Sequence, residues 1–187
     1  GKDTTVRTYV QKVAEKEKVP SDWCYVHNFF EADNPLAIEL PPGEGLEFSK
    51  DMDELVRLCK TEIPKALAGE EYEKRKNSII NNFQSKRDKS LAETRQKAEK
   101  VGFDVRLTPT GILTVIMVNG KPLKPEDYDK LSPEKEEEVQ RRSSELQPDV
   151  NQLTIKIRTL EKETRGRLQQ LDREIALFVV GHLLDAL

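Results

Sequence analysis

The feature that most constrains the fold is a long apolar seam in the C-terminal third of the chain. Its residues recur at three- and four-residue steps, which is the spacing of a coiled-coil face on a helix. They are Val139, Ser143, Leu146, Val150, Leu153, Ile157, Leu160, Thr164, Leu168, Leu171, Ile175 and Phe178. Ser132-Pro133 predicts the helix start, as a cap followed by proline at the first helical position. Pro148 is expected to kink this helix or to divide it in two.

The expected partner of the seam is a charged helix over residues 66–100, which returns antiparallel. This stretch has no proline and one glycine, and Glu70 with Lys74 forms a favourable i,i+4 pair worth about 0.2–0.5 kcal/mol. Its apolar stripe is too sparse to stabilise so long a helix alone. The stripe consists of Tyr72, Ile79, Ile80, Phe83, Leu91, Ala98 and Val101.

A small β unit is expected between the two helices. Phe103, Val105 and Leu107 alternate with polar residues, and residues 112–118 are strongly β-branched. Asn119-Gly120 is a strong tight-turn signal. Because an isolated hairpin is marginal in water, we expect a third strand around Leu123 or a helix to pack on.

The N-terminal stretch predicts a helix followed by strands. Val6, Val10 and Val13 recur at helical spacing within residues 4–18. Residues 23–30 predict a buried strand, and residues 36–40 alternate as in a half-buried strand. We expect Trp23, Tyr25 and Leu40 to be core residues.

Beyond the Pro-Gly turn at residues 41–45, residues 46–48 are expected to return as a short strand. Ser49 is a candidate N-cap for the helix that follows. One apolar helix face is then supplied by Met52, Leu55, Val56, Cys59 and Ile63.

These elements predict an α+β fold that is mostly α. We expect a partial α/β base over residues 1–64 and a coiled-coil-like helical arm over residues 65–187, with its β-hairpin at about 103–123. From Ile175 the last helix is apolar almost all round, so its end is expected to enter a globular core. The apolar end at Leu187, without a cap or polar tail, indicates that a larger protein continues beyond it.

Composition excludes several classes of function. The chain is 35% charged with a net charge of −3, so no overall field draws it to nucleic acid or to a membrane. Two cysteines are too few for a disulfide framework and indicate a reducing compartment. The chain shows no signal peptide and no apolar run near the roughly 20 residues of a membrane span. We therefore expect a cytoplasmic protein.

The first residues are a candidate nucleotide site. Gly1-Lys2 before a helix could be the tail of a phosphate-binding loop, in which lysine contacts the β/γ-phosphates and Ser or Thr holds magnesium. Asp3 stands where that Ser or Thr belongs, although Thr4 and Thr5 follow. The alternative is that Gly1 is an added residue with no role in binding.

Other chemistry-bearing residues favour structural roles. Cys24 and His27 have a metal-ligand spacing, but a strand would point them to opposite faces, and Cys59 and His182 are solitary. We expect no metal site and no catalytic residue in this chain. The acidic cluster Glu134–Glu138 predicts a solvated helical face. The same holds for a set of basic residues interleaved with acids: Lys74, Arg75, Lys76, Lys86, Arg87 and Lys89.

Several segments resemble the Lon-like ATP-dependent proteases of the B and C types, whose peptidase uses a Ser-Lys dyad. They are DWCYVHNF at residues 22–29, NPLAIELPPGEG at 34–45, and F-x-x-D-M at 48–52. In that family this block follows the phosphate loop and its helix, an order that matches Gly1-Lys2 and the helix after it. GFDVRLTPTGILTVIMVNGKPL at residues 102–123 and the flanking helices resemble the family's helical insertion.

The resemblance implies part of a AAA+ module with a helical insertion. Lys2, with Thr4 beside it, would match the phosphate-loop tail, and ATP with magnesium would serve the intact protein rather than this fragment. The acidic strand motif and the Ser-Lys dyad would lie beyond Leu187, so the fragment itself would not cleave peptides. The parent would form a hexamer and degrade unfolded or damaged proteins, with the arm at the entrance of its chamber. The alternative is a non-enzymatic coiled-coil or chaperone-like interaction module.

Overall fold

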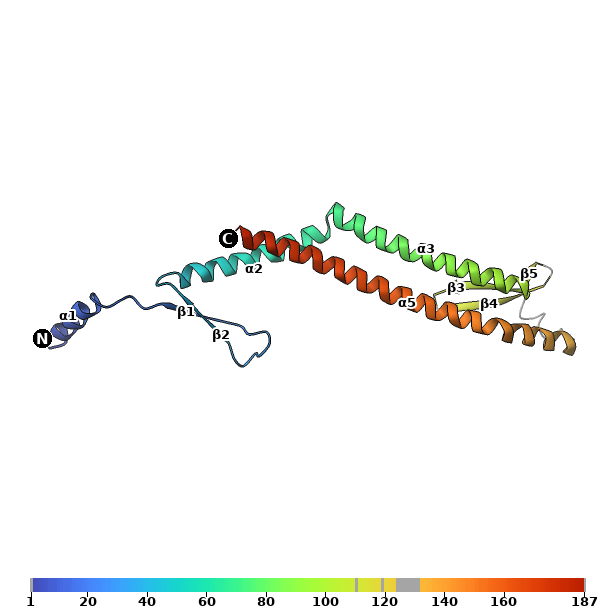
Figure 1. The fold of residues 1–187 in the computed structure, drawn as a ribbon, viewed down its shortest axis with the longest axis horizontal. Helices are drawn as coiled ribbons and strands as arrows, with labels where there is room; N and C mark the ends of the chain where they lie inside the picture. Colours follow the sequence, from blue (N-terminus) through green and yellow to red (C-terminus); the bar gives the residue numbers. More distant parts are fainter. Residues whose placement is uncertain (1, 110, 119, 124–131, 187) are drawn as a thin grey trace. The chain divides into compact units, whose positions relative to one another are not determined.

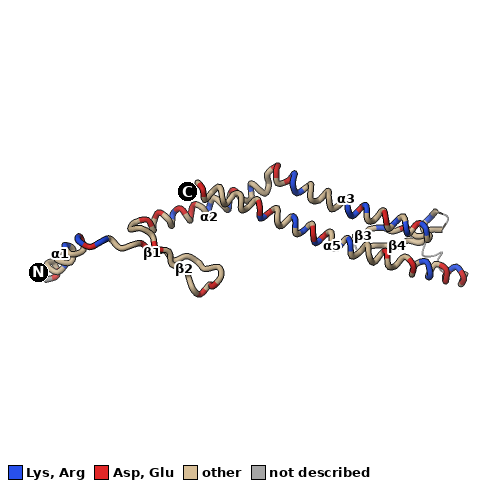
Figure 2. Tube along the Cα trace, viewed as in Figure 1, with Lys and Arg blue, Asp and Glu red and all other residues tan. Residues whose placement is uncertain are grey.

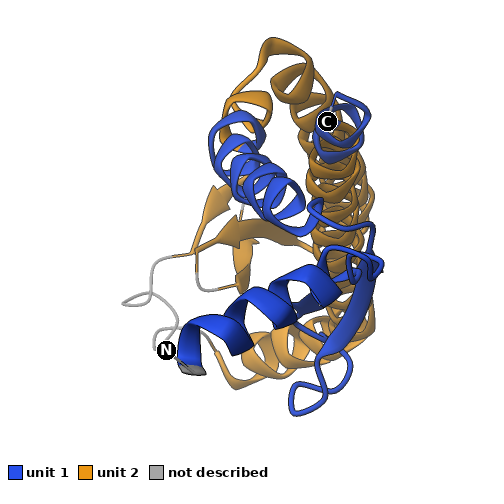
Figure 3. Ribbon diagram, turned by 90° about the vertical axis from the view of Figure 1, so that its left-hand side faces the viewer, with its two compact units in different colours: residues 1–63, 179–187 blue, residues 64–178 orange. Residues whose placement is uncertain are grey.

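The computed structural model describes residues 2–109, 111–118, 120–123 and 132–186. It divides the chain into two units, residues 1–63 with 179–187 and residues 64–178 (Figure 3). The fold is mostly helical, with two small antiparallel sheets and a long C-terminal helix, which confirms the predicted fold class. The domain boundary between residues 64 and 65 stays a prediction, and each unit is described below by itself.

The unit of residues 64–178 is built on two antiparallel helices, α3 (Glu70–Lys100) and α5 (Pro133–Asp185). A three-stranded sheet packs against both helices near one end of the pair (Figure 1). Its strands are β3 (Phe103–Thr108), β4 (Gly111–Val118) and β5 (Lys121–Pro122), in the order β3-β4-β5. Leu123 extends the third strand, because its N–H donates to the carbonyl of Ile116 at 2.8 Å. The predicted hairpin and third strand are therefore confirmed, while Asn119 lies outside the described residues.

The core of this unit lies where the sheet meets both helices. Strand register pairs Phe103 with Ile116 and Leu107 with Ile112, so one face of the sheet is apolar. Ala98 on α3 is fully buried, and its small side chain lets the sheet approach the helix closely. The buried cluster consists of Ala98, Phe103, Val105, Leu146, Val150 and Leu153.

The predicted seam and its partner are confirmed. Leu146, Val150, Leu153 and Leu171 are buried on α5. Polar contacts join α3 to α5 in antiparallel order: Lys97 pairs with Asp149, Arg75 pairs with Glu174 at 2.7 Å, and the Tyr72 hydroxyl donates to Asp172 at 2.7 Å. Exposed pairs of this kind contribute about 0–1 kcal/mol each, so they fix the register more than they stabilise the fold.

The predicted break at Pro148 is wrong, because α5 is one helix from Pro133 to Asp185. Proline removes one helix hydrogen bond and crowds the preceding turn, at a cost of roughly 3 kcal/mol. Pro148 is exposed, and so is Ser144, whose carbonyl loses its partner. Water can therefore bond that carbonyl, and the buried Leu146 and Val150 on either side hold the helix together.

The predicted start of the charged helix is also wrong. Instead of one helix from residue 66, α2 (Gly45–Leu67) ends first and α3 begins at Glu70. Gly69 between them is extended, with φ −75° and ψ 156°. The N–H groups of Ala68 and Gly69 close the end of α2 by bonding carbonyls of residues 64–66. Pro64 and Gly69 lie close together here, and both weaken helix continuity.

The other unit holds α1 (Lys2–Ala14), β1 (Asp22–Val26), β2 (Leu36–Leu40) and most of α2. β1 and β2 pair antiparallel, from Asp22 opposite Leu40 to Val26 opposite Leu36. The predicted helix is confirmed, although it ends at Ala14 rather than at residue 18, and the second strand is confirmed. The first strand ends at Val26 rather than at residue 30, because a hydrogen-bonded turn takes over at Asn28.

The predicted strand at residues 46–48 and the N-cap at Ser49 are wrong. α2 already begins at Gly45, so these residues lie in its first turns. Asp22 caps the helix instead: its Oδ2 accepts the N–H of Gly43 at 3.0 Å and that of Gly45 at 2.8 Å. The carboxylate also lies at the positive end of the helix dipole.

The predicted burial of this unit is wrong as well. Trp23 is 57% exposed and Tyr25 is 72% exposed, while Leu40 is half-buried. Phe178 and Leu184 near the end of α5 are exposed, so that end does not enter a core within the described residues. Among the described residues of this unit, the one buried side chain is the polar Asn28. Polar contacts rather than apolar burial therefore fix its local geometry.

We expect Leu153→Ala to lower the free energy of unfolding of the 64–178 unit by about 2–5 kcal/mol, because it opens a cavity in the core. Leu153 is 2% exposed and touches the sheet cluster. The matched control is Ile155→Ala on the same helix, where the side chain is 65% exposed and the change should stay within about 0.5 kcal/mol. Urea unfolding followed by helical circular dichroism measures both. Equal effects would contradict the assigned core.

Candidate functional site

The turn between β1 and β2 is organised by the side chain of Asn28. Its Oδ1 accepts the N–H of Phe30 at 3.0 Å and that of Glu31 at 3.3 Å. Its Nδ2 donates to the carbonyl of Asn34 at 3.0 Å, across the turn. Asn28 is only 8% exposed, so these three hydrogen bonds are screened from water. The turn therefore holds its shape through its own residues.

This turn presents two phenylalanines to solvent. Phe29 is 90% exposed and Phe30 is 102% exposed. The ring of His27 meets that of Phe29 edge-on, with centroids 4.8 Å apart and planes at 88°. Glu31 and Asp33 follow directly and are exposed. The turn thus offers an aromatic pair with acidic side chains beside it.

The other end of the hairpin is fixed to α2. In addition to the Asp22 cap, the Cys24 Sγ lies 4.0 Å from the carbonyl of Gly45. A Cβ atom at Gly45 would lie 3.0 Å from both the Cβ and the Oδ2 of Asp22. Glycine at this position therefore permits the close approach of the hairpin to the helix.

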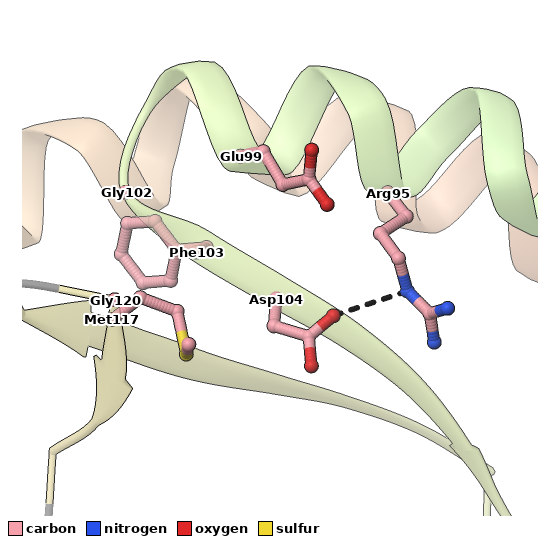
Figure 4. A pocket seen from close by; sticks show the side chains of 7 residues that line it. All are labelled: Arg95, Glu99, Gly102, Phe103, Asp104, Met117 and Gly120. Atoms are coloured by element: carbon pink, nitrogen blue, oxygen red, sulfur yellow. Dashed lines mark ion pairs between the residues drawn. The ribbon is translucent and has the colours of Figure 1, made fainter.

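A second polar cluster lines a groove of about 560 Å³ between α3 and the sheet (Figure 4). The carboxylate of Asp104 lies 3.1 Å from Arg95 and 2.8 Å from Arg106. Arg95 also donates two hydrogen bonds to the carbonyl of Val105, at 3.2 and 3.0 Å. This cluster ties β3 to α3, and its charged groups are engaged with one another rather than poised for catalysis.

The hydrogen bond from Arg106 holds the pKa of Asp104 below its ordinary value. Partial burial opposes this shift, and the charges of Arg95 and Arg106 reinforce it. The carboxylate is thus stabilised in its ionised form. It acts as a structural acceptor in the fold, since a general acid would need the opposite shift.

The predicted phosphate-loop residues lie at the start of α1. Lys2 is the first residue of that helix, and its side chain lies outside the described residues, as does Gly1. Thr4 is exposed, and its carbonyl accepts a hydrogen bond from the Thr8 hydroxyl at 2.8 Å. Their role in nucleotide binding therefore stays a prediction.

The structure does not gather the other candidate residues into one site. Cys24 is half-buried on β1, whereas His27 lies beyond the strand end and is exposed. Cys59 lies on α2 and His182 on α5. Within the described ranges, no three His, Cys, Asp or Glu side chains lie close enough to hold a metal ion.

Charges on α3 and α5 alternate in sign along both helices (Figure 2). Lys74 pairs with Glu70 at 2.7 Å, and Arg87 pairs with Asp88 at 2.8 Å. The acidic cluster Glu134–Glu138 is exposed in the first turns of α5. This interleaving matches the predicted solvated faces.

Sequence reasoning missed Asn28, Asp22 and the phenylalanine pair. Asn28 had only a general signal: asparagine side chains often bond backbone N–H groups two and three positions on, but here Phe29 and Phe30 follow it directly. Asp22 had none, since its partners lie 21 and 23 residues away in sequence.

We expect Asp104→Asn to lower stability by about 1–3 kcal/mol at neutral pH, because two arginines lose a charged acceptor. The folded pKa of Asp104 lies below the unfolded value of about 3.9, so this contribution is present above that pH and disappears as pH falls through the folded pKa. The difference between variant and wild type should therefore shrink from pH 7 to pH 3 in urea unfolding.

The control for this experiment is Glu99→Gln, which changes a carboxylate lining the same groove. Among the described residues Glu99 has no ion-pair partner, so its effect should be small at every pH. A pH-independent difference for Asp104→Asn would contradict the ionic role of Asp104.

No described helix has both the length and the hydrophobicity that crossing a membrane requires. Among protein families, the chain matches one described as a Lon-like LonC helical domain, over residues 22–55. The match covers β1, the Asn28 turn, β2 and the first turns of α2. A search of curated proteins gave no match. The family match supports a relationship to Lon-like proteases at a coarse level.

Proposed function

We propose that this chain is part of a Lon-like serine protease, and that α3, α5 and their sheet help to form the entrance for unfolded polypeptides. The family match at residues 22–55 supports the protease context. The observation that carries the proposal is the architecture of the 64–178 unit, in which a pair of long helices packs around one small core. Such a unit is suited to shaping a passage rather than to chemistry.

The dimensions and surface of the helix pair support a role as a wall. The 31 residues of α3 extend about 46 Å at 1.5 Å per residue. Exposed positions carry both signs of charge, and many are paired along the same helix. A surface of this kind is hydrated and offers little for an apolar chain to adhere to. A polypeptide could therefore pass along it without being trapped.

Peptide hydrolysis would be carried out by residues outside this chain. Within the described residues, Cys24 and His27 have no catalytic partner set, and the Arg95–Asp104–Arg106 cluster is structural. The Ser-Lys dyad that the resemblance implies would lie elsewhere in the intact protein. We accordingly assign this chain an accessory role in a serine endopeptidase.

ATP with magnesium remains part of the proposal for the intact protein. The N-terminus of α1 would offer unpaired N–H groups to a phosphate, with Lys2 and Thr4 nearby. Asp3 in the first turn opposes this, because its carboxylate repels phosphate. The groups at the start of α1 thus fit ATP only in part. The proposed role of the helix pair does not depend on ATP binding. We also propose a homo-hexameric, cytoplasmic parent with unfolded proteins as substrates.

A second candidate function is a non-enzymatic, chaperone-like interaction module. It is favoured by the exposed apolar side chains of the N-terminal unit, such as Trp23, Tyr25 and Phe30. The two candidates differ in the product they leave. A chaperone-like module would suppress aggregation of an unfolded protein without cutting it, whereas the protease would yield peptides.

The test shortens the helix pair in the protein expressed from the complete reading frame. Phe83 and Glu163 line the same hollow between α3 and α5, so joining them by a short glycine-containing turn deletes residues 84–162. This removes the outer part of both helices together with the sheet and its core. We expect degradation of a reduced, carboxymethylated protein to slow by about tenfold or more, equivalent to ~1.4 kcal/mol. Cleavage of a short fluorogenic peptide should be unchanged, because it needs no guided entrance.

The matched control is Arg75→Gln, which removes one exposed pair with Glu174 and keeps the full length. It should leave both rates unchanged. Equal rates for the shortened and full-length proteins on the unfolded substrate would contradict the proposal, as would the absence of peptidase activity from the complete protein.

A further inference from the structure

A hollow at the end of the core is enclosed by α3, α5 and the turn that joins β3 to β4. Its volume is about 490 Å³, which lies in the range of small-molecule sites. Ile112 and Ile157 line it and also pack against the buried cluster. The hydroxyl of Thr108 donates to the carbonyl of Gly111 at 2.9 Å and shapes the turn. The walls of the hollow are therefore set by the fold of the 64–178 unit itself.

Apolar side chains from all the surrounding elements face this hollow. Phe83 comes from α3, Leu107 from β3, Ile112 from β4 and Ile157 from α5, and each is half-buried. A half-buried apolar side chain still exposes area to water, and an apolar group in the hollow would cover that area. The hollow thus complements a short hydrocarbon chain or ring.

The charged residues that line the hollow are two arginines and one acid, Arg87, Arg158 and Glu161. Arg87 is already engaged: its Nε and Nη2 donate to the Oδ1 of Asp88 at 3.0 and 2.8 Å. Its guanidinium also lies 5.8 Å from the ring centre of Phe83. Arg158 is exposed and has no ion-pair partner among the described residues. Its guanidinium is therefore the group available to an added anion.

These charges select the kind of anion. A guanidinium binds a carboxylate through two parallel hydrogen bonds, a geometry that a lysine cannot reproduce. Glu161 lines the same hollow and repels a group with several negative charges, such as a phosphate. An ammonium group would meet two arginines instead. The best match is one negative charge joined to an apolar chain.

We propose that this hollow binds small amphipathic carboxylates of the medium-chain fatty acid kind. The carboxylate pairs with Arg158, and the hydrocarbon chain lies against Phe83, Leu107 and Ile157. Because the ligand would touch α3, the hairpin and α5 together, its binding stabilises the folded unit. The site goes beyond the proposed protease role and does not depend on it.

The test is isothermal titration calorimetry with the whole 187-residue chain and three probes of equal length: octanoate, 1-octanol and octylammonium. We expect octanoate to bind at least about tenfold more tightly than octylammonium, because only the carboxylate forms a charged pair with Arg158. Octanoate should also raise the midpoint of thermal unfolding.

Two variants separate the charge from the apolar wall. Arg158→Gln should weaken octanoate binding by about tenfold and leave octanol binding unchanged, since the alcohol has no charge to lose. Arg158→Glu should reverse the preference, so that octylammonium binds more tightly than octanoate. Leu107→Ser should weaken octanoate and octanol alike, with circular dichroism showing that the variant is folded at the temperature used.

The matched control is Arg165→Gln, which removes an exposed arginine two turns further along α5, away from the residues that line the hollow. It should bind octanoate as wild type does. A weakening equal to that of Arg158→Gln would show a general effect of charge and would overturn the proposal.

The proposal is also overturned if octanoate does not bind, or if Arg158→Gln binds it as tightly as wild type. The second result would place the ligand on exposed apolar groups elsewhere, such as Val6 and Val10 on α1. A short peptide that ends in leucine with a free carboxylate is a further probe. Tighter binding of this peptide than of octanoate would assign the hollow to a polypeptide end and would overturn the fatty acid proposal.

This readout is independent of the helix-pair experiment, because it requires neither hydrolysis nor an unfolded substrate. Octanoate binding that depends on Arg158, in a complete protein without peptidase activity, would support the site and remove the protease function. Degradation that depends on the helix pair, without octanoate binding, would do the reverse.

Discussion

The contact between the sheet and the two long helices is the constraint on which the 64–178 unit depends. Ala98, Val105 and Leu153 meet there, and each is almost completely buried. Away from this cluster the helix pair is held mainly by single residues such as Leu171 and by exposed polar pairs. Exposed pairs contribute little to stability. The sheet is therefore essential to this unit, because it provides the third layer that packs against both helices and closes the core.

The N-terminal unit is organised in a different way. It lacks buried apolar side chains within its described residues, and its geometry is set by polar side chains. Asp22 fixes the hairpin to α2, and Asn28 fixes the turn at its other end. Short-range bonds of this kind specify local shape without a core. They leave apolar surface available for contact, which a packed domain would have hidden.

The elements whose apolar residues recur at a regular spacing could be predicted from sequence. Periodic patterns of apolar residues predict the seam on α5, its antiparallel partner helix and the β-hairpin, and the structure confirms all three. The effect of Pro148 on the helix was misjudged, because the energetic cost of a proline in a helix is local. The burial of Leu146 and Val150, which offsets that cost, depends on tertiary structure. The start of α2 was missed because Asp22, distant in sequence, supplies its cap.

Burial of the N-terminal unit was misjudged for a related reason. Aromatic and β-branched composition identifies β1 correctly as a strand, but composition says nothing about which face is covered. Trp23 and Tyr25 share the outward face of β1, while Cys24 and Val26 alternate with them and are half-buried. An aromatic face on a two-stranded sheet and an aromatic pair in a turn are different kinds of surface. The first is defined by its strand, whereas the second is defined by the hydrogen bonds of Asn28. The polar residue that sequence reasoning passed over is therefore the one that fixes the turn in which the aromatic pair is exposed.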